Sequence, residues 1–428
     1  MEDLKSLKKT LNNIQLEGFE NIKCGDMLHY SLIRGIANNG SQGVKASLKF
    51  YIKVIRLLMT EVYKVESSGD ASSLFVFSSA YGARKDLLNN FTLVSDLIKN
   101  RVVIYAYPHY KCSLKKLRYL KQIKIWKKLL LKEIKNKSLC YNIIFDLVRV
   151  YLEYQEILSK IDFDKIKSLV SFCDVHPTES FLTQLFNNMN RCTVTLQHGV
   201  YSSEVNEWVF SGSKSRYLLG YGNFTIDEGS KNPLYHGNIL SVGSMSFIGK
   251  ERIPKPDQFT TNKIGLVLDG EDGIGLHELN ERFIKFSQNY CKTRNIKLLV
   301  KFHPASDIKT YLDVIDNNVV ESYYGSDLSI MDFMNKIDVA LVRNSTCAIE
   351  TLHFWIPTYI FSEEAQTIDV YKNVNDCKFS NEEELDQYIT NINSPEMHKK
   401  ISDLRDYFCV DDNMEKRFTE VLNGLGIV

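Results

Sequence analysis

Short apolar runs alternate with helix-like segments along most of the chain. In the first half, the runs that predict buried strands lie at 73–77, 102–106, 166–173, 192–196, 217–220 and 239–242. Segments at 84–99 and 179–188 have the pattern of helices between them. Strand, helix and strand at this spacing predict parallel βαβ units.

The start of the chain has a different pattern. Apolar residues recur there at three- and four-residue steps, at Leu48, Ile52, Ile55 and Met59. This period is typical of a helix with one apolar face. We therefore expect residues 1 to about 65 to be helical.

A second series of elements begins after a polar, proline-containing stretch at about 250–263, which predicts a linker. The apolar runs that predict its strands lie at 264–268, 296–302, 339–342 and 357–361. The segments that predict its helices lie at 276–294, 327–336 and 347–354. We expect two Rossmann-like α/β domains, residues 1–250 and 251–428.

Composition narrows the class of protein. A chain of 428 residues, 44% apolar and 25% charged, has the length of two globular domains. Its net charge of +1 gives no electrostatic reason to expect a nucleic-acid partner. The nine cysteines are scattered without a CxxC pair, which predicts reduced thiols and argues against a disulfide framework or structural zinc.

The hydropathy pattern bears on location. No run of about 18 apolar residues is present, and the first residues lack the apolar core of a signal peptide. We expect a cytoplasmic protein whose contact with a membrane, if any, is peripheral on the inner face of the plasma membrane.

Residues 111–137 form a strongly basic segment, with eleven lysines and arginines against one acid, Glu133. Its apolar residues recur at helical spacing, at Leu114, Leu117, Leu120, Ile123, Trp126, Leu130 and Ile134. A basic amphipathic helix suits an anionic membrane surface or an acidic polymer. The alternative is a helix whose apolar stripe packs on its own domain and whose lysines are solvated.

His198 follows the predicted strand 192–196 in the string Gln197-His198-Gly199. The end of a parallel strand is where an open α/β sheet presents its ligands. An imidazole there can accept a proton from a hydroxyl near neutral pH, and Gly199 permits a tight turn or close approach. A single histidine can equally be structural.

Lys301 and His303 end the predicted strand 296–302, and Pro304 restricts the backbone that follows. An ammonium and an imidazole at a strand end suit the phosphates of a nucleotide. A histidine that caps the following turn is the alternative. A second His-Pro string, His176-Pro177, lacks a preceding lysine.

Ser345 and Thr346 lie between the predicted strand 339–342 and the helix 347–354. Their hydroxyls suit a helix N-cap and a phosphate contact alike. Glu350 lies about one turn into the helix, where its carboxylate could accept hydrogen bonds from a ribose. A plain N-cap and a surface charge are the alternatives.

Gly270 belongs to a glycine-rich loop, residues 268–275, after the first strand of the second half. Glycine allows the backbone to approach a phosphate, although the three acids of the loop make a direct phosphate cradle awkward. The loop is neither a Walker motif nor a dinucleotide-binding GxGxxG. We expect it to border the donor site.

These motifs together resemble those of the GT-B polymerases and transferases that build bacterial surface glycans. The resemblance covers about residues 190–365 and is closest to the CDP-glycerol glycerophosphotransferase-like enzymes of teichoic acid and capsule synthesis. Bacterial sialyltransferases look similar too, with a His-Pro motif and a Ser/Thr pair. The strings that carry it are His198-Gly199, Lys301-Phe302-His303-Pro304, Asn344-Ser345-Thr346 with Glu350, and Pro357.

The resemblance implies an α/β GT-B fold, with two Rossmann-like domains that face a central cleft. It implies a nucleotide-activated sugar or polyol donor, a glycan or lipid-linked acceptor, and no cofactor or metal. Residue by residue, His198 resembles the base, His303 the ligand of the donor phosphate, and Ser345 and Thr346 the phosphate-binding hydroxyls.

Two departures leave the chemistry open. Val200-Tyr201 stands where the teichoic-type enzymes usually have Thr-Pro, and Glu271-Asp272-Gly273 does not occupy the place of the sialyltransferases' acidic base. The transferred group is therefore a sugar or a polyol phosphate. Two alternatives remain: a GT-B-like sugar-nucleotide epimerase, and a non-catalytic capsule-assembly protein.

Overall fold

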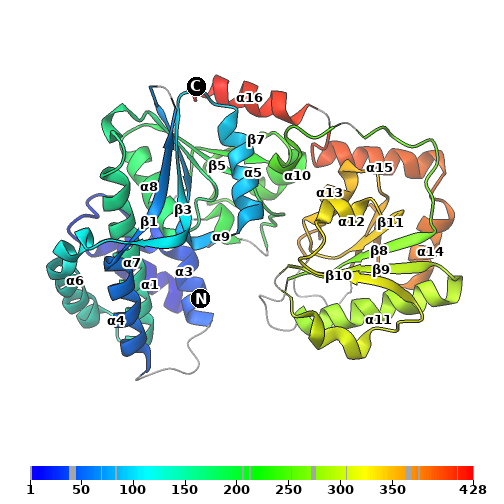
Figure 1. The fold of residues 1–428 in the computed structure, drawn as a ribbon, viewed down its shortest axis with the longest axis horizontal. Coiled ribbons are helices and arrows are strands. Elements are labelled where there is room, and N and C mark those ends of the chain that lie inside the picture. Colours follow the sequence, from blue (N-terminus) through cyan, green and yellow to red (C-terminus); the bar gives the residue numbers. More distant parts are fainter. Residues whose placement is uncertain are drawn as a thin grey trace.

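The structure is a computed structural model. It describes residues 2–37, 45–68, 70–81, 84–204, 207–211, 214–251, 253–270, 276–304, 306–362, 369–374, 376–411 and 413–427. Within these ranges the chain forms two sheets, each covered by helices on both faces (Figure 1).

The first sheet has seven strands in the order β1-β3-β2-β4-β5-β6-β7. All neighbours are parallel except β1, which runs antiparallel to β3 at the edge. The strands are β1 (Thr60–Ser67), β2 (Ser73–Phe77), β3 (Arg101–Cys112), β4 (Ser168–Ser171), β5 (Cys192–Leu196), β6 (Tyr217–Gly220) and β7 (Asn238–Ser241).

Strand β1 was not expected, because the sequence predicted helix up to about residue 65. Helix α4 (Lys45–Leu58) ends first, and the strand begins two residues later. Contacts from a distant helix support the strand: the backbone amides of Val62 and Tyr63 donate to the Glu156 carboxylate at 3.0 and 2.8 Å. The strand therefore depends on a partner that lies far away in the sequence.

Ten α-helices accompany this sheet. They are α1 (Glu2–Asn13), α2 (Cys24–Met27), α3 (His29–Ala37), α4, α5 (Lys85–Asp96), α6 (Leu120–Glu133), α7 (Lys137–Leu158), α8 (Pro177–Asn188), α9 (Glu207–Phe210) and α10 (Gly222–Ser230). The 3-10 helices are η1 (Ser79–Tyr81), η2 (Lys115–Tyr119), η3 (Phe163–Lys165) and η4 (Met245–Phe247). None of the helices in the described ranges is both long and apolar enough to cross a membrane.

Alternate residues of β2 face two separate cores, as the period of a strand requires. Leu74 and Val76 pack with helices α1, α4, α6, α7 and α8 on one face. Phe75 and Phe77 pack on the other face with α5 and with the last helix of the chain. Because both faces are covered, the strand is apolar after Ser73, which is why its sequence was easy to identify.

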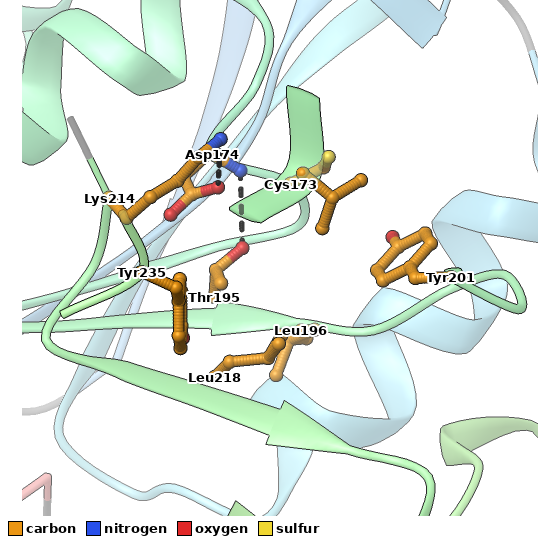
Figure 2. Close-up of a pocket in the computed structure, with 9 residues that line it drawn as sticks. Cys173, Asp174, Thr195, Leu196, Tyr201, Lys214, Leu218 and Tyr235 are labelled. Carbon is orange, nitrogen blue, oxygen red and sulfur yellow. Dashed lines mark hydrogen bonds and ion pairs between the residues drawn. The ribbon is translucent and has the colours of Figure 1, made fainter. Parts of the chain in front are cut away.

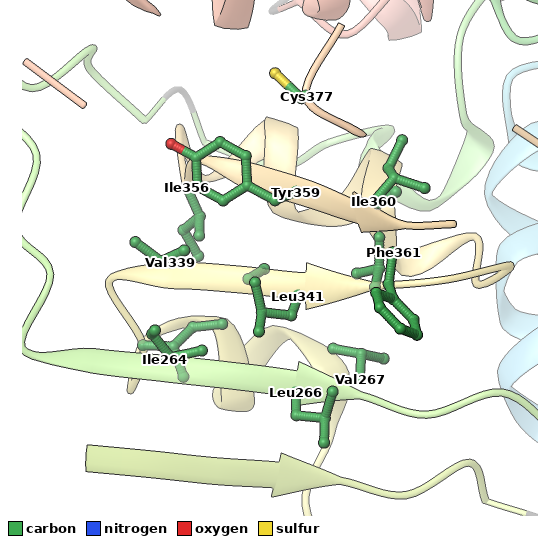
Figure 3. Close-up of a cluster of buried hydrophobic side chains, with 14 of the residues drawn as sticks. Ile264, Leu266, Val267, Val339, Leu341, Ile356, Tyr359, Ile360, Phe361 and Cys377 are labelled. Atoms are coloured by element: carbon green, nitrogen blue, oxygen red, sulfur yellow. The ribbon is translucent and has the colours of Figure 1, made fainter. Parts of the chain in front are cut away.

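The second sheet has six parallel strands in the order β10-β9-β8-β11-β12-β13. They are β8 (Lys263–Val267), β9 (Lys297–Lys301), β10 (Val320–Tyr324), β11 (Val339–Val342), β12 (Thr358–Phe361) and β13 (Lys378–Phe379). Its helices are α11 (Leu276–Arg294), η5 (Ile308–Val314), α12 (Ile330–Met334), α13 (Cys347–His353), α14 (Glu382–Thr390) and α15 (Pro395–Tyr407). Figure 3 shows Ile264, Leu341 and Tyr359 in its core.

The chain passes between the two units twice. The first passage runs from β7 to β8, and the second leads from α15 to α16 (Met414–Gly424). Helix α16 packs through Phe418 and Leu422 into the core of the first sheet. The two sheets are therefore connected by two passages of the chain and by the packing of α16 against the first sheet.

Helices α10 and α15 form the main packed contact between the units. The rings of Phe224 and Phe408 lie 4.9 Å apart between centroids, and Tyr407 donates a hydrogen bond to Asp227 at 2.9 Å. The fold is thus α/β with two Rossmann-like domains. The GT-B arrangement expected from the sequence is confirmed.

A substitution at Gly222 tests this contact, because the backbone of α15 comes very close to the glycine. Its φ is +65°, and a Cβ at this position would lie 2.3 Å from the carbonyl oxygen of Tyr407. We predict that Gly222→Ala lowers the free energy of unfolding by about 2 kcal/mol or more, because backbone strain and the clash add. Urea unfolding measures the change.

Gly424 provides the control for this substitution. It lies in α16, and a Cβ at this position would meet no heavy atom within 4 Å. Gly424→Ala should leave stability unchanged or raise it by up to about 1 kcal/mol. Equal effects of the two substitutions would contradict the packing described for α10 and α15.

Candidate functional site

The loops that follow β5 and β11 meet between the two sheets. The backbone amide of Val200 donates to Thr346 Oγ1 at 3.3 Å. A Cβ on Gly199 would lie 3.8 Å from the same oxygen. The strand-end loop that carries His198 therefore contacts the start of α13. The structure brings together two groups that the sequence marked separately.

His198 is held by aromatic neighbours of its own domain. Its ring stacks on Phe172 at 4.6 Å between centroids, and its Nδ1 lies 2.9 Å from the Tyr201 hydroxyl. Burial lowers the pKa of His198 to about 4; hydrogen bonds with the backbone at Leu196 and Phe172 oppose this shift, and the charge of Arg84 adds to it. The imidazole is neutral at pH 7, and its contacts fix the orientation of the ring.

Two residues that the sequence did not select lie beside His198. Tyr81, at the end of η1, contacts both His176 and His198, with ring centroids 4.7 and 6.0 Å apart. His176 precedes α8, just past β4, and also contacts Tyr30. The signal in the sequence was the strand-end position of His176, which is the argument that selected His198.

A small cavity lies under this loop region (Figure 2). Asp174 accepts a hydrogen bond from the Ser215 amide at 2.7 Å, and its own amide donates to Thr195 at 3.1 Å. The ammonium of Lys214 lies 3.5 Å from the same carboxylate. Burial raises the pKa of Cys173 to about 12, so its thiol is protonated. These contacts tie the loops after β4 and β5 together.

A buried ion pair organises the strand ends of the second sheet. Arg343, which is 2% exposed, donates from Nε to the Asp269 carboxylate at 2.8 Å. The same carboxylate accepts the backbone amide of Asn344 at 3.1 Å. Burial raises the pKa of Asp269, and the Arg343 guanidinium opposes that shift. The loops after β8 and β11 are locked to one another at this point.

Gly270 and His303 are in contact. A Cβ on Gly270 would lie 3.2 Å from the imidazole Nδ1 and Cε1 of His303, closer than most such contacts. Glycine at this position lets the imidazole lie against the backbone just past Asp269. The remainder of the glycine-rich loop, residues 271–275 with two of its three acids, lies outside the described residues.

Lys301 is buried under this region. Its ammonium donates to the carbonyl oxygens of Gly325 and Phe302, and its side chain is 4% exposed. Burial lowers the pKa of Lys301, while the charges of Cys347 and Asp327 oppose the shift. The side chain therefore links the loops after β9 and β10 through hydrogen bonds to their backbone carbonyl oxygens.

Ser345 and Thr346 directly precede α13, and both hydroxyls already have hydrogen-bond partners within the protein. The Ser345 hydroxyl accepts from the Cys347 amide at 3.2 Å, and its carbonyl accepts from Tyr371 at 2.7 Å. Thr346 contacts the first domain through Val200, as described above. The hydroxyls thus lie at the domain contact.

Glu350 projects from the same helix. Burial raises its pKa; a hydrogen bond with Cys347 opposes the shift, and the charge of Asp86 adds to it. Asp86 belongs to α5 of the first domain, so a charge of the opposite domain acts on the Glu350 carboxyl group. The predicted site residues therefore form two groups: the His198 loop with Thr346 and α13, and Gly270 with His303.

Comparison with known proteins places the fold. No protein-family model and no curated protein sequence matches the chain. Among solved structures, S. aureus MnaA in complex with UDP matches at 12% identity and a TM-score of 0.50, over 83% of this chain and 97% of that chain.

Two other solved structures match less well. The UDP-GlcNAc 2-epimerase of Methanocaldococcus jannaschii with UDP-GlcNAc and UDP matches at 12% identity and a TM-score of 0.48, over 83% and 99% of the chains. The wall teichoic acid polymerase TagF matches at 12% identity and a TM-score of 0.39, over 64% and 74%. At such identities the likeness concerns the fold alone.

The buried pair between Asp269 and Arg343 gives a stability prediction. Arg343→Met leaves a carboxylate buried without its partner, so we expect a loss of about 3–5 kcal/mol in the free energy of unfolding. The double variant Asp269→Leu with Arg343→Met should recover part of that loss. Urea unfolding measures both.

Lys372→Met is the control for a charge on the surface. The Lys372–Glu204 pair joins the domains at 2.8 Å, but both side chains are largely exposed to solvent, at 59% each. We expect no measurable change in stability. A loss equal to that of Arg343→Met would mean that burial does not govern the strength of these pairs.

The lowered pKa of His198 predicts a pH dependence of stability. Its pKa is about 4 in the folded chain and 6.5 ordinarily, so the unfolded chain binds the proton more readily between these values. The free energy of unfolding should therefore fall as the pH drops from 6.5 to 4.

Unfolding of His198→Gln across this pH range tests the assignment. The variant should show a shallower decline than the parent chain, because one group that takes up a proton on unfolding is gone. His236→Gln, at an exposed position, is the control. An unchanged slope in His198→Gln would show that the imidazole does not titrate in this way.

Proposed function

We propose that this chain is a glycosyltransferase, or a polyol-phosphate transferase, that uses a nucleotide-activated donor to build a bacterial capsule, O-antigen or teichoic-type surface polysaccharide. The observation that carries the proposal is the hydrogen bond from the Val200 amide to Thr346. It joins the strand-end loop of one Rossmann-like domain to that of the other. Strand ends are where such sheets bind ligands, so this contact is a suitable place for donor and acceptor to meet.

The donor would bind the second domain, which is the part of residues 251–428 that forms the second sheet and its helices. His303 and the hydroxyls of Ser345 and Thr346 would contact its phosphates, and Gly270 would let the backbone come close to them. Lys301, whose ammonium donates to the carbonyl oxygens of Phe302 and Gly325, would add positive charge near the phosphates and fix the loop after β9. Fixed donors of this kind stabilise a leaving phosphate without reorganising at the moment of reaction.

Glu350 would accept hydrogen bonds from the donor's ribose hydroxyls. The side chain is partly exposed, so a ligand can reach it, and the protein around it raises its pKa. The ribose would thus be recognised at the same helix as the phosphates.

The acceptor, a glycan or lipid-linked saccharide, would bind the first domain, residues 1–250. Its hydroxyl oxygen would form the new bond as the bond to the donor's phosphate breaks, and the nucleotide would leave. The hydroxyl proton would pass to His198, whose neutral imidazole can accept it at pH 7. His176 and Tyr81 lie close enough to orient that acceptor.

A sugar-nucleotide epimerase is the second candidate. Burial raises the pKa of Glu350 and lowers that of His198, so it favours the neutral form of a carboxylic acid and of an imidazole beside the domain contact. Such a pair could move a proton on a bound nucleotide sugar without any acceptor. A capsule-assembly protein that binds nucleotide without turnover is the remaining alternative.

The test is a thermal-shift screen of the full chain against CMP, CDP, UDP, GDP and their sugar or polyol conjugates. We expect one nucleotide to stabilise the protein, by about 2.7 kcal/mol at a hundredfold excess over Kd. His303→Ala should abolish the shift, whereas His398→Ala, a histidine of α15 in the same domain, should retain it.

Glu350→Gln sharpens this experiment. The substitution removes a carboxyl group whose charged form its surroundings disfavour, so the free protein should melt at the same temperature or higher. Nucleotide affinity should fall about tenfold, because a carboxylate acceptor for the ribose is lost. A stabilised variant with unchanged affinity would remove Glu350 from the site.

Turnover assays separate the candidates. Release of nucleotide only in the presence of an acceptor supports the transferase, and loss of this reaction in His198→Gln but not in the exposed His236→Gln supports the assigned base. Conversion of the donor sugar without an acceptor would favour the epimerase. Binding without either reaction would favour the assembly protein, and no binding at all would contradict the proposed function.

A further inference from the structure

Helix α4 has a second apolar face that the described residues of its own domain leave exposed. Its buried apolar residues are Phe50, Val54 and Leu58. Its exposed ones, together with Met59 directly after its end, have exposed fractions of 45, 60, 53 and 38%: Tyr51, Ile52, Ile55 and Met59. At about 100° per residue, the exposed set spans an arc of about 100° beside the buried set. The spacing of Ile52, Ile55 and Met59 predicted one apolar face of a helix, and in the structure these three residues are exposed.

The 3-10 helix η2 and its flanking residues continue this apolar surface. Because a 3-10 helix has three residues per turn, residues three apart share one side. Three leucines line one such side, with exposed fractions of 59, 38 and 41%: Leu114, Leu117 and Leu120. The next positions along the chain are all exposed cations: Lys115, Arg118 and Lys121.

The third side of η2 faces the protein. Lys116 is buried and pairs with Glu156 at 2.6 Å, and the Tyr119 hydroxyl donates to Gln155 at 3.0 Å. These two contacts fix how the short helix is rotated. The leucine side and the basic side therefore both point outward.

Helix α4 and η2 lie side by side. The Ser113 amide donates to the carbonyl oxygen of Met59 at 2.8 Å, and Lys127 of α6 lies 4.6 Å from the Tyr51 ring centroid. We call the combined surface the apolar–basic face; its apolar members are Tyr51, Ile52, Ile55, Met59, Leu114, Leu117 and Leu120. Figure 1 shows α4 and α6 at the end of the first domain remote from the second.

Packing within the domain explains only the later part of the basic segment 111–137. Ile123, Trp126, Leu130 and Ile134 are buried in the core beside α7. The two alternatives for this segment therefore divide along its length: the stripe from Ile123 to Ile134 packs inward, whereas the three leucines before it are exposed among the described residues.

We infer that the apolar–basic face binds an anionic lipid bilayer. Its leucine and isoleucine side chains would enter the boundary between headgroups and acyl chains, and its cations would meet lipid phosphates. Exposed cations flank both apolar stripes: Lys49, Lys53 and Arg56 on α4, and Lys115, Arg118 and Lys121 beside η2. The one acid of 111–137, Glu133, lies at the far end of α6.

Charge selects this partner over a second copy of the chain. Two such faces brought together would oppose their cations in a region of low dielectric, which is costly. An anionic bilayer offers opposite charge and an apolar layer at the same time. Binding to it requires no turnover, so the inference stands or falls independently of the proposed transferase activity.

The experiment is co-sedimentation of the full chain with vesicles. We expect binding to phosphatidylcholine vesicles that contain phosphatidylglycerol, weak binding to phosphatidylcholine alone, and a decline with added salt. Arg118→Gln with Lys121→Gln should weaken binding about 30-fold, at the usual contribution of each cation near a membrane.

Apolar substitutions on the two elements test the face separately. Ile52→Ser with Ile55→Ser, and Leu114→Ser with Leu117→Ser, should each weaken binding about tenfold or more. The matched controls are Leu234→Ser, an apolar residue 60% exposed elsewhere in the first domain, and Lys165→Gln with Lys167→Gln. These controls should bind as the parent chain does.

Three results would overturn the inference. Equal binding to both kinds of vesicle, or variants that bind like the parent, would show that the face does not contact lipid. A lowered melting temperature in the serine variants would show that the face is packed. Self-association of the parent chain that the serine variants lose, measured by sedimentation velocity, would identify a second copy as the occupant.

Discussion

The arrangement of the second domain depends on the buried ion pair between Asp269 and Arg343. Removing two charges from water costs several kcal/mol per ion unless hydrogen bonds replace the lost solvent. Here the carboxylate accepts from Arg343 and from the Asn344 amide, and the Asn280 amide oxygen receives a further guanidinium N–H at 3.3 Å. The pair joins loops that are 74 residues apart, and a register error between β8 and β11 would leave both charges without partners.

Several candidate residues take their positions from this pair. Gly270 follows Asp269 directly and lies against the His303 imidazole. Asn344 follows Arg343, and its side chain accepts the Val370 amide at 3.0 Å. Ser345 and Thr346 come next, and through Thr346 the second domain reaches the first. A single electrostatic constraint thus extends from the sheet to the domain contact.

Burial acts in opposite directions on the two titratable groups nearest that contact. It lowers the pKa of His198 and raises that of Glu350, so it favours the neutral form of each. A region that favours neutral groups makes any bound negative charge dependent on fixed dipoles and on the few cations in reach. The exposed cations of the apolar–basic face lie at the end of the first domain that is remote from this contact.

The sequence by itself determined both sheets in outline. Runs such as 74–77 and 339–342 are apolar throughout because parallel strands covered on both faces have no solvent side, and the structure forms β2 and β11 there. The tertiary structure decided what local pattern leaves open. Strand β1 depends on the distant Glu156, and His176 gained significance only when Tyr81 was folded against it.

The same limit applies to the direction of side chains. Periodicity groups Ile52 with Ile55 and Leu114 with Leu117, but it does not say which apolar face of a helix meets the core. Lys301 has the sequence of a strand-end ligand, yet its ammonium reaches the carbonyls of Gly325 and Phe302. Spacing along a chain sets which residues share a face, whereas burial depends on which other segments arrive there, and only the folded chain brings those segments together.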